Sequence, residues 1–417
     1  MNKRYQNILL VLVAIGLLYF ARNSANLGHD FQVFVYAGGK LVNGLDIYKP
    51  PFIQNLQYYN SPLFALLLSP FANFPIIIPQ ILWIFLSYFL LFKIWTLSIE
   101  YFEPTKQNYL PSLTTDQKWI WLSLTLLLSI RFIVFDLGFV QLTTFLLWCT
   151  LQSFKLFKEK KDLKGAALLA LAINIKLLPI PFVLYLVYRR NFKAVLFLCI
   201  FFIIYLFLPA LYLGWNRNLQ LTQEWFSVIN PANKEWNIEA EDGPSSLVAL
   251  VPVYLTHTVG VLSFKRNFTD LNFHSVNLIL NIVRGFFIVL TLAFLNSRPF
   301  TTVNDKIRQY WEMCYIFLII PLIYPHQQVY AYVYMMPVFI YLSWYLISYW
   351  VNIRYKVNVV GWLVLGIIAF NFTPLVNKSL LTKNYYEILL YLRILPIAAI
   401  TLIPILWICR PQNIKTD

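Results

Sequence analysis

The chain has 417 residues, of which 59% are hydrophobic and only 12% are charged. A soluble protein of this length needs about 25% charged residues to cover its surface, so the composition excludes an ordinary soluble domain. The mean hydropathy of +0.63 and repeated apolar runs of about 20 residues indicate an all-α polytopic membrane protein. A β-barrel is disfavoured because the runs are continuous and do not alternate in polarity.

The net charge of +15 arises from Lys and Arg that stand mostly in short clusters between apolar runs. This is the pattern of positively charged cytoplasmic loops, which also meet anionic lipid headgroups. Membrane lipids are therefore expected as partners, and nucleic acid is not. The four cysteines fall within apolar runs, where we expect small buried hydrophobes and neither disulfides nor metal ligands.

Twelve membrane spans are predicted, with both termini in the cytoplasm. They cover residues 8–21, 62–78, 80–98, 119–135, 138–154, 165–188, 193–213, 275–295, 311–325, 327–350, 357–374 and 386–408. The first span follows "MNKR" and has only a poor small-residue cleavage site after it, so we interpret it as a retained signal anchor. The expected location is a plasma (inner) membrane of bacterial type.

One loop conflicts with a strict count of twelve. The lysine-rich segment 155–164 would lie outside, although positive loops belong inside. In the alternative, residues 165–188 form a hairpin that turns at 176–179, and 62–78 does not cross. The sequence does not choose between them. Both place Asp30 and His326 on the extracytoplasmic side.

The chain shows no internal repeat and no soluble domain, so a single membrane-embedded domain is predicted over residues 1–417. Two extracytoplasmic loops, 22–61 and 215–274, are expected to carry the active site. There is no phosphate-binding glycine loop, no paired-histidine zinc motif and no CxxC. No metal or cofactor is therefore expected, and ATP-driven transport and metallopeptidase activity are disfavoured.

Asp30 stands where the first span should leave the hydrocarbon, in "LGHDFQVFVYAGGKLVNGLDIY". The following residues, including Phe31, Phe34 and Tyr36, are too apolar for a solvated loop and have roughly helical spacing. The Gly38–Gly39 pair allows either close packing or a bend. A carboxylate at such a position is partly desolvated, which raises its pKa toward the range useful to a general base. Asp46 is read as a solvated loop residue.

Three further positions carry polar groups in apolar surroundings. His326 and Gln327 lie in "IYPHQQVYAYVYMMP", a polar and aromatic patch of the kind that suits sugar hydroxyls. Lys176 lies inside an apolar run, where it either partners an anionic group or reaches to an interface. Arg131 has the same status, but Asp136 offers a ready partner, so a structural pair is expected. "YYNSPLF" is read as a helix start.

These residues together make the chain resemble glycosyltransferase family 87, a family of polyprenyl-phosphate-mannose-dependent enzymes with the GT-C fold. The family signature of an Asp, an aromatic residue, Tyr-Ala-Gly, Leu-x-x-Gly and a Tyr is matched from Asp30 to Tyr48. Weaker similarities are found in "YYNSPLFALLLSPFANFP", in the Lys176 helix, in "GPSSLVAL" and in "IYPHQQVYAY". The Gly-Gln-x-Asn element keeps its glutamine as Gln141 in "GFVQLTT".

The resemblance implies an inverting transfer of a hexose, expected to be mannose, from a polyprenyl-phosphate-linked donor to a glycolipid or glycan acceptor. Asp30 would be the general base. Lys176 and His326 would meet the donor phosphate, and the substrate-binding set is expected to be completed by Gln141, Tyr36, Tyr48 and Gln327. The alternatives are a transporter or flippase for a lipid-linked saccharide and a non-catalytic membrane scaffold.

Overall fold

The computed structural model describes residues 16, 30–102, 113–230, 243–258, 260–295 and 297–411. This described part of the chain contains helices and no strands, which confirms the all-α class. Apart from Gly16, the predicted first span lies outside the described residues, as does the middle of the 215–274 loop.

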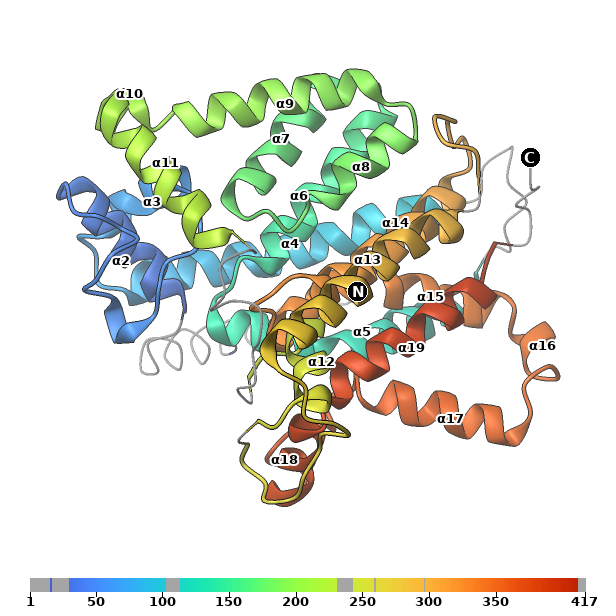
Figure 1. Cartoon of the computed structure of the whole chain (residues 1–417). Coiled ribbons are helices and arrows are strands. Elements are labelled where there is room, and N and C mark those ends of the chain that lie inside the picture. The colour runs from blue at the N-terminus through green and yellow to red at the C-terminus, as the bar shows by residue number, and fades with distance from the viewer. Residues whose placement is uncertain are drawn as a thin grey trace. The chain divides into compact units, whose positions relative to one another are not determined.

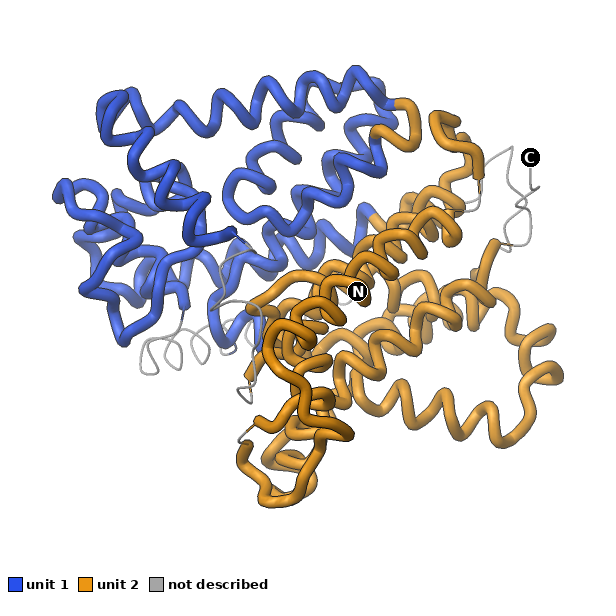
Figure 2. The backbone as a smooth tube through the Cα atoms, in the orientation of Figure 1, with its two compact units in different colours: residues 1–97, 134–186, 191–233 blue, residues 98–133, 187–190, 234–417 orange. Residues whose placement is uncertain are grey.

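The chain divides into two compact units, which Figure 2 shows in two colours. The first unit comprises residues 1–97, 134–186 and 191–233, and the second comprises residues 98–133, 187–190 and 234–417. Each unit is described by itself below. The single domain over residues 1–417 stays a prediction.

The first unit contains the helices that surround Asp30. They are α2 (Asp30–Val42), η1 (Ile53–Asn55), α3 (Pro62–Leu68), η2 (Ser69–Phe71), most of α4 (Ile77–Phe102), α6 (Thr143–Lys158), α7 (Asp162–Ile175), α8 (Pro181–Tyr188), α9 (Phe192–Phe207), α10 (Ala210–Leu213) and α11 (Trp215–Ile229). Figure 1 shows α9 lying along the top of this unit, with α7 and α8 below it.

The second unit contains most of the C-terminal half of the chain. Its helices are most of α5 (Thr115–Phe139), α12 (Leu247–Leu255), α13 (Phe273–Leu295), α14 (Lys306–Ile323), η4 (Val329–Met335), α15 (Met336–Ser348), α16 (Trp350–Ile353), α17 (Val359–Phe370), α18 (Lys383–Tyr391) and α19 (Ile394–Ile408). Its core is aromatic, with Phe294 stacked on Trp311 at 4.2 Å between ring centroids.

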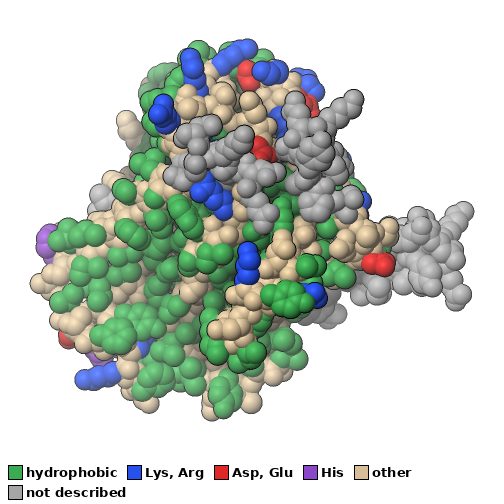
Figure 3. Space-filling view, turned by 90° about the vertical axis from the view of Figure 1, so that its right-hand side faces the viewer, with side chains coloured by type: hydrophobic (Ala, Val, Ile, Leu, Met, Phe, Trp, Pro, Cys, Tyr) green, Lys and Arg blue, Asp and Glu red, His purple; other side chains and the backbone are tan. Residues whose placement is uncertain are grey.

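Among the described residues, five helices are long and apolar enough to cross a membrane, and six if the bent pair α18–α19 is one span. They cover Ile77–Phe102, Thr115–Phe139, Phe192–Leu213, Phe273–Leu295 and Val329–Ser348, with Lys383–Ile408 as the bent pair. Hydrophobic side chains cover much of the face in Figure 3, as expected for helices that face lipid. The chain is thus a membrane protein, and the count of twelve spans stays a prediction.

Residues 165–188 form the predicted hairpin and not a single crossing helix. Helix α7 ends at Ile175, Lys176 has an extended backbone, and α8 begins only at Pro181. Helices α7 and α9 begin at the same end, because Lys193 Nζ lies 3.5 Å from Asp162 Oδ2. The basic segments 155–164 and 188–193 therefore lie at one end of this helical group, which removes the charge conflict of the strict count.

Residues 62–78 also fail to form one span. Helix α3 and η2 together cover ten residues, about 15 Å of helix against a hydrocarbon thickness of about 30 Å, and α4 begins separately at Ile77. Ser61 starts α3 by accepting a hydrogen bond from the backbone N–H of Phe64 at 3.3 Å, with Pro62 at the first helical position. This confirms that "YYNSPLF" is a helix start.

Helix α6 ends in a tight turn that needs a left-handed residue. The N–H of Lys160 donates to Phe157 O at 3.1 Å, and that of Lys161 donates to Leu156 O at 2.9 Å. This pair of bonds is a Schellman motif, whose C′ position is usually glycine. Lys160 fills it with φ of +61°, although a side chain disfavours this conformation.

We expect Lys160→Gly to stabilise the protein by about 1 kcal/mol, because glycine adopts positive φ without steric cost. Lys155→Gly, on the same helix with helical backbone, is the matched control and should destabilise by about 1 kcal/mol. Thermal unfolding in detergent should move in opposite directions for the two variants. A lower midpoint for Lys160→Gly would contradict the turn geometry.

Candidate functional site

Asp30 is the first residue of α2, the helix predicted from the spacing of its apolar residues. Phe31, Phe34 and Leu41 share one side of this helix and are buried. Phe34 contacts Phe64 of α3, with 5.6 Å between ring centroids. The segment is therefore a packed helix whose first residue carries the carboxylate.

The glycine pair in α2 serves close packing and not a bend, because the helix is continuous through it. A Cβ atom on Gly38 would lie 2.8 Å from Ser69 N and 2.9 Å from Ala65 O. Both are backbone atoms, which cannot move aside as a flexible side chain can. Gly38 thus lets α2 approach α3 and η2 directly, and this contact holds Asp30 in place.

Trp83 of α4 connects α2 with the start of α6. Its ring lies 5.7 Å from that of Phe31 and 5.9 Å from that of Phe145. Its indole N–H donates to the backbone carbonyl of Gln141 at 3.0 Å. A half-buried tryptophan that both packs and donates a hydrogen bond fixes the position of its neighbours, here the segments that carry Asp30 and Gln141.

Gln141 is the first polar partner of Asp30, and its side-chain amide donates a hydrogen bond to Asp30 Oδ2. Its own backbone N–H donates to Asp136 O at 2.9 Å and completes a Schellman motif at the end of α5. Val140 occupies the C′ position of this motif with φ of +52°. A β-branched residue in that conformation is strained, and such strain clusters at functional sites.

Lys176 is the second partner of Asp30. It follows the last residue of α7 in extended conformation, and its charge interacts with the carboxylates of Asp30 and Asp136. The end of α7 is tied to α3, because Ser61 Oγ donates to Asn174 Oδ1 at 2.9 Å. The structure thus brings together three predicted site residues, Asp30, Gln141 and Lys176.

Sequence reasoning missed the residues that support this cluster. Asn174 and Ser61 carry no signal beyond the Ser-Pro helix start. Asp136, fully buried, accepts a hydrogen bond from Thr144 Oγ1 at 2.6 Å. The expected Arg131–Asp136 pair is wrong, because Arg131 instead donates to Asn371 O at 2.7 Å. Residues five apart on a helix point about 140° away from each other, which explains the error.

The environment of Asp30 shifts its protonation equilibrium. Burial raises the pKa of Asp30 above its ordinary 3.8, while the positive charge of Lys176 and the hydrogen bond from Gln141 oppose this rise. Burial disfavours the charged form, and the two partners favour it. The result is a carboxyl group more basic than a solvated aspartate, which accepts a hydrogen bond from Gln141 and interacts with the charge of Lys176.

Two predicted substrate-binding tyrosines, Tyr36 and Tyr48, have hydrogen bonds of their own. Tyr48 is buried and donates to Asn60 O at 2.8 Å, so the structure gives it a packing contact. Tyr36 is exposed and lines a cavity of about 460 Å³, together with Gln32, Lys40 and Phe74. No contact between described residues joins either tyrosine to Asp30. Their role in substrate binding stays a prediction.

His326 and Gln327 belong to the second unit, where "GPSS" and "PHQQ" meet. Ser245 N donates to Gln327 O at 2.6 Å, and Tyr332 Oη donates to Ser245 O at 2.6 Å. Gln327 also donates from its side chain to Pro325 O at 2.6 Å. His326 has φ of +56°, a second strained position in a predicted functional segment.

No group of three or more His, Cys, Asp or Glu side chains that could hold a metal ion is found in the part of the chain that the structure describes. The family model of glycosyltransferase family 87 matches residues 58–302, which is more than half of the chain. No curated protein and no solved structure matches it. The matched range includes Gln141 and Lys176 and begins after Asp30.

The raised pKa of Asp30 predicts a loss of stability as pH rises. The unfolded chain releases its proton near pH 3.8 and the folded protein only at higher pH, so unfolding is favoured across this window and beyond it. The Asp30→Asn variant has no carboxyl group to ionise at this position, so it avoids this loss of stability. We expect it to unfold at a higher temperature than the wild type at pH 7. The pH dependence of the thermal midpoint checks this.

Asp46→Asn is the matched control with the opposite sign. Asp46 is not freely solvated as expected, because it pairs with Lys49 at 2.9 Å and accepts from Tyr48 N at 3.0 Å. Despite partial burial, these contacts lower the pKa of Asp46. Ionised Asp46 therefore stabilises the folded state at neutral pH, and this stabilisation disappears as pH falls through the lowered pKa. Asp46→Asn should therefore destabilise the protein at pH 7, and equal shifts of the thermal midpoint for both variants would contradict these opposite pKa shifts.

Proposed function

The chain belongs to glycosyltransferase family 87, and from this premise we propose that it moves a hexose, mannose in the first instance, from a polyprenyl-phosphate-linked donor to a glycolipid or glycan acceptor. The observation that carries the proposal is the partly buried carboxylate of Asp30, held by Gln141 and by the charge of Lys176. A carboxyl group with a raised pKa and an oriented oxygen suits a general base at neutral pH.

In the proposed reaction, Asp30 accepts the proton of an acceptor hydroxyl while that oxygen attacks the anomeric carbon of the donor. The new carbon–oxygen bond forms as the bond to the phosphate oxygen breaks, and the electron pair leaves with the polyprenyl phosphate. This single displacement inverts the anomeric centre. Gln141 orients the carboxylate, so that the reacting oxygen stays directed toward the acceptor.

Lys176 acts on both charges of this reaction. It favours the ionised form of Asp30 before transfer, and its positive charge would stabilise the phosphate that leaves. His326 and Gln327 are proposed as further donor-binding residues. The reaction needs no cofactor in this scheme, and it would take place on the extracytoplasmic face of a bacterial-type plasma membrane.

Asp30→Asn should lower the transfer rate by about 10²- to 10⁴-fold, the usual contribution of a general base. The assay uses purified protein, a series of radiolabelled polyprenyl-phosphate sugars and a membrane glycolipid extract as acceptor. Asp46→Asn should transfer at the wild-type rate. Equal rates for wild type and Asp30→Asn would exclude Asp30 as the base. If no donor supports transfer but proteoliposomes move a lipid-linked saccharide, the transporter alternative is favoured.

Lys176→Met should shift the acidic limb of the pH–rate profile to higher pH. Removal of the positive charge raises the pKa of Asp30, so a higher pH is needed to ionise the base. Lys176→Arg keeps the charge and should leave the limb near its wild-type position. The measurement is the pH dependence of kcat/KM. A lower rate with an unmoved limb would restrict Lys176 to the leaving group.

A further inference from the structure

Arg131 is a buried arginine that has no acidic partner among the described residues. It lies within α5, inside the predicted span 119–135, and only 5% of its surface is exposed. Its guanidinium donates to the backbone carbonyl of Asn371 at 2.7 Å and interacts with the hydroxyl of Tyr386, while its Nε has no hydrogen-bond partner. No carboxylate among the described residues lies within ion-pair distance of it.

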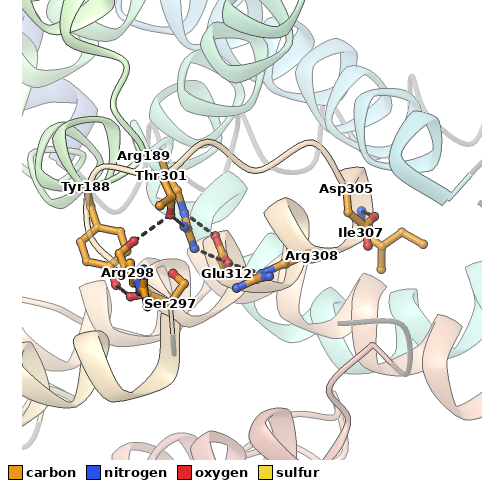
Figure 4. Close-up of polar contacts among 9 residues, drawn as sticks. All are labelled: Tyr188, Arg189, Ser297, Arg298, Thr301, Asp305, Ile307, Arg308 and Glu312. Atoms are coloured by element: carbon orange, nitrogen blue, oxygen red, sulfur yellow. Dashed lines mark hydrogen bonds and ion pairs between the residues drawn. The ribbon is translucent and has the colours of Figure 1, made fainter. Parts of the chain in front are cut away.

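Another buried arginine of the same unit, Arg189, does have a carboxylate partner. Arg189 holds Glu312 with two hydrogen bonds, one of them from Nε to Oε2 at 3.0 Å, and Arg308 Nε lies 3.1 Å from Glu312 Oε1 (Figure 4). Thr301 Oγ1 lies 3.3 Å from Arg189 Nη1. The forked guanidinium thus meets a planar anion, which is its preferred partner. At Arg131 no such anion is found in the part of the chain that the structure describes.

The partners that Arg131 does have compensate only part of its charge. Asn371 is the residue that ends α17, and a helix C-terminus supplies roughly half of a negative elementary charge. The ring of Phe132, 6.0 Å from the guanidinium carbon, adds a weak attraction. A net positive charge therefore remains in an apolar interior, which is an environment that favours the binding of an anion.

Arg131 also adjoins the segment that carries His326. Its charge interacts with Tyr332, and Phe132 stacks on the ring of Tyr332 at 5.6 Å. The hydroxyl of Tyr332 donates to Ser245 O, and Ser245 N donates to Gln327 O. Arg131 is thus joined through Tyr332 and Ser245 to the segment that carries the predicted site residues His326 and Gln327.

We propose that Arg131 is the cationic ligand of a phosphate group carried by a lipid, bound through the guanidinium edge that lacks a protein anion. The inference rests on the proposed function, because a polyprenyl-phosphate sugar is the substrate that brings such a group. A bulk anionic phospholipid carries the same chemistry. The experiment therefore separates the two sources.

The test measures lipid binding to the full-length protein in neutral detergent by native mass spectrometry. The probes are undecaprenyl phosphate, the matching polyprenol without phosphate, and phosphatidylglycerol. We expect the wild type to bind undecaprenyl phosphate and not the polyprenol. Arg131→Met should weaken that binding about 10- to 100-fold, the loss expected for a charge-assisted hydrogen bond.

Two variants control this result. Arg308→Met removes an arginine that already has a carboxylate partner, and it should leave the affinity for undecaprenyl phosphate unchanged. Arg131→Lys keeps the charge but loses the fork, so its affinity should lie between those of the wild type and Arg131→Met. If Arg131→Met does not fold, Arg131→Lys decides, and an affinity equal to wild type then overturns the proposal.

The outcomes distinguish this inference from the proposed function. If the wild type and Arg131→Met bind undecaprenyl phosphate equally, Arg131 has only a structural role and the proposed function is untouched. If Arg131→Met loses undecaprenyl phosphate and phosphatidylglycerol alike, the phosphate site stands with bulk lipid as its occupant. If the wild type binds no lipid phosphate, the inference and the lipid-linked donor are both excluded. If Asp30→Asn transfers sugar at the wild-type rate, the role of Asp30 as general base is excluded, and the phosphate site at Arg131 is unaffected.

Discussion

A carboxylate that is partly removed from water needs directed donors or opposite charge, and the arrangement around Asp30 supplies both. Gln141 donates a hydrogen bond, and Lys176 provides the charge. These two residues come from separate turns, one at the end of α5 and the other after α7. The hairpin of α7 and α8 thereby becomes part of the site, because a straight helix over 165–188 would not end at Lys176.

The same rule of charge compensation orders the second unit. Glu312 is fully buried between Arg189 and Arg308 and is satisfied by them. Such a cluster stabilises a fold only when each charge has its partner, since a lone buried charge is costly. Arg131 departs from this rule, and departures that a protein retains are the places to look for a bound ligand.

Strained backbone is found next to two of the predicted site residues. Val140 and His326 have positive φ, next to Gln141 and Gln327 respectively. Each unfavourable conformation costs about 1–3 kcal/mol and persists only where the surrounding contacts over-determine it. At Val140 these contacts are the two Schellman hydrogen bonds and the indole of Trp83. These two strained residues therefore belong to turns next to predicted site residues, whereas Lys160 has the same conformation in a turn away from them.

The sequence by itself determined the helical class, the membrane character, the glycosyltransferase resemblance and the helical spacing after Asp30. The first two follow from composition and the length of the apolar runs, the spacing is a local periodicity, and the resemblance rests on matched motifs. The sequence could not decide whether residues 165–188 cross the membrane once or turn back. It also suggested a pair of Arg131 and Asp136 that the structure does not contain. Only the tertiary structure joined Asp30 with Gln141 and Lys176, which are 111 and 146 positions later in the chain. Such contacts depend on packing between distant helices, for which local patterns carry no information.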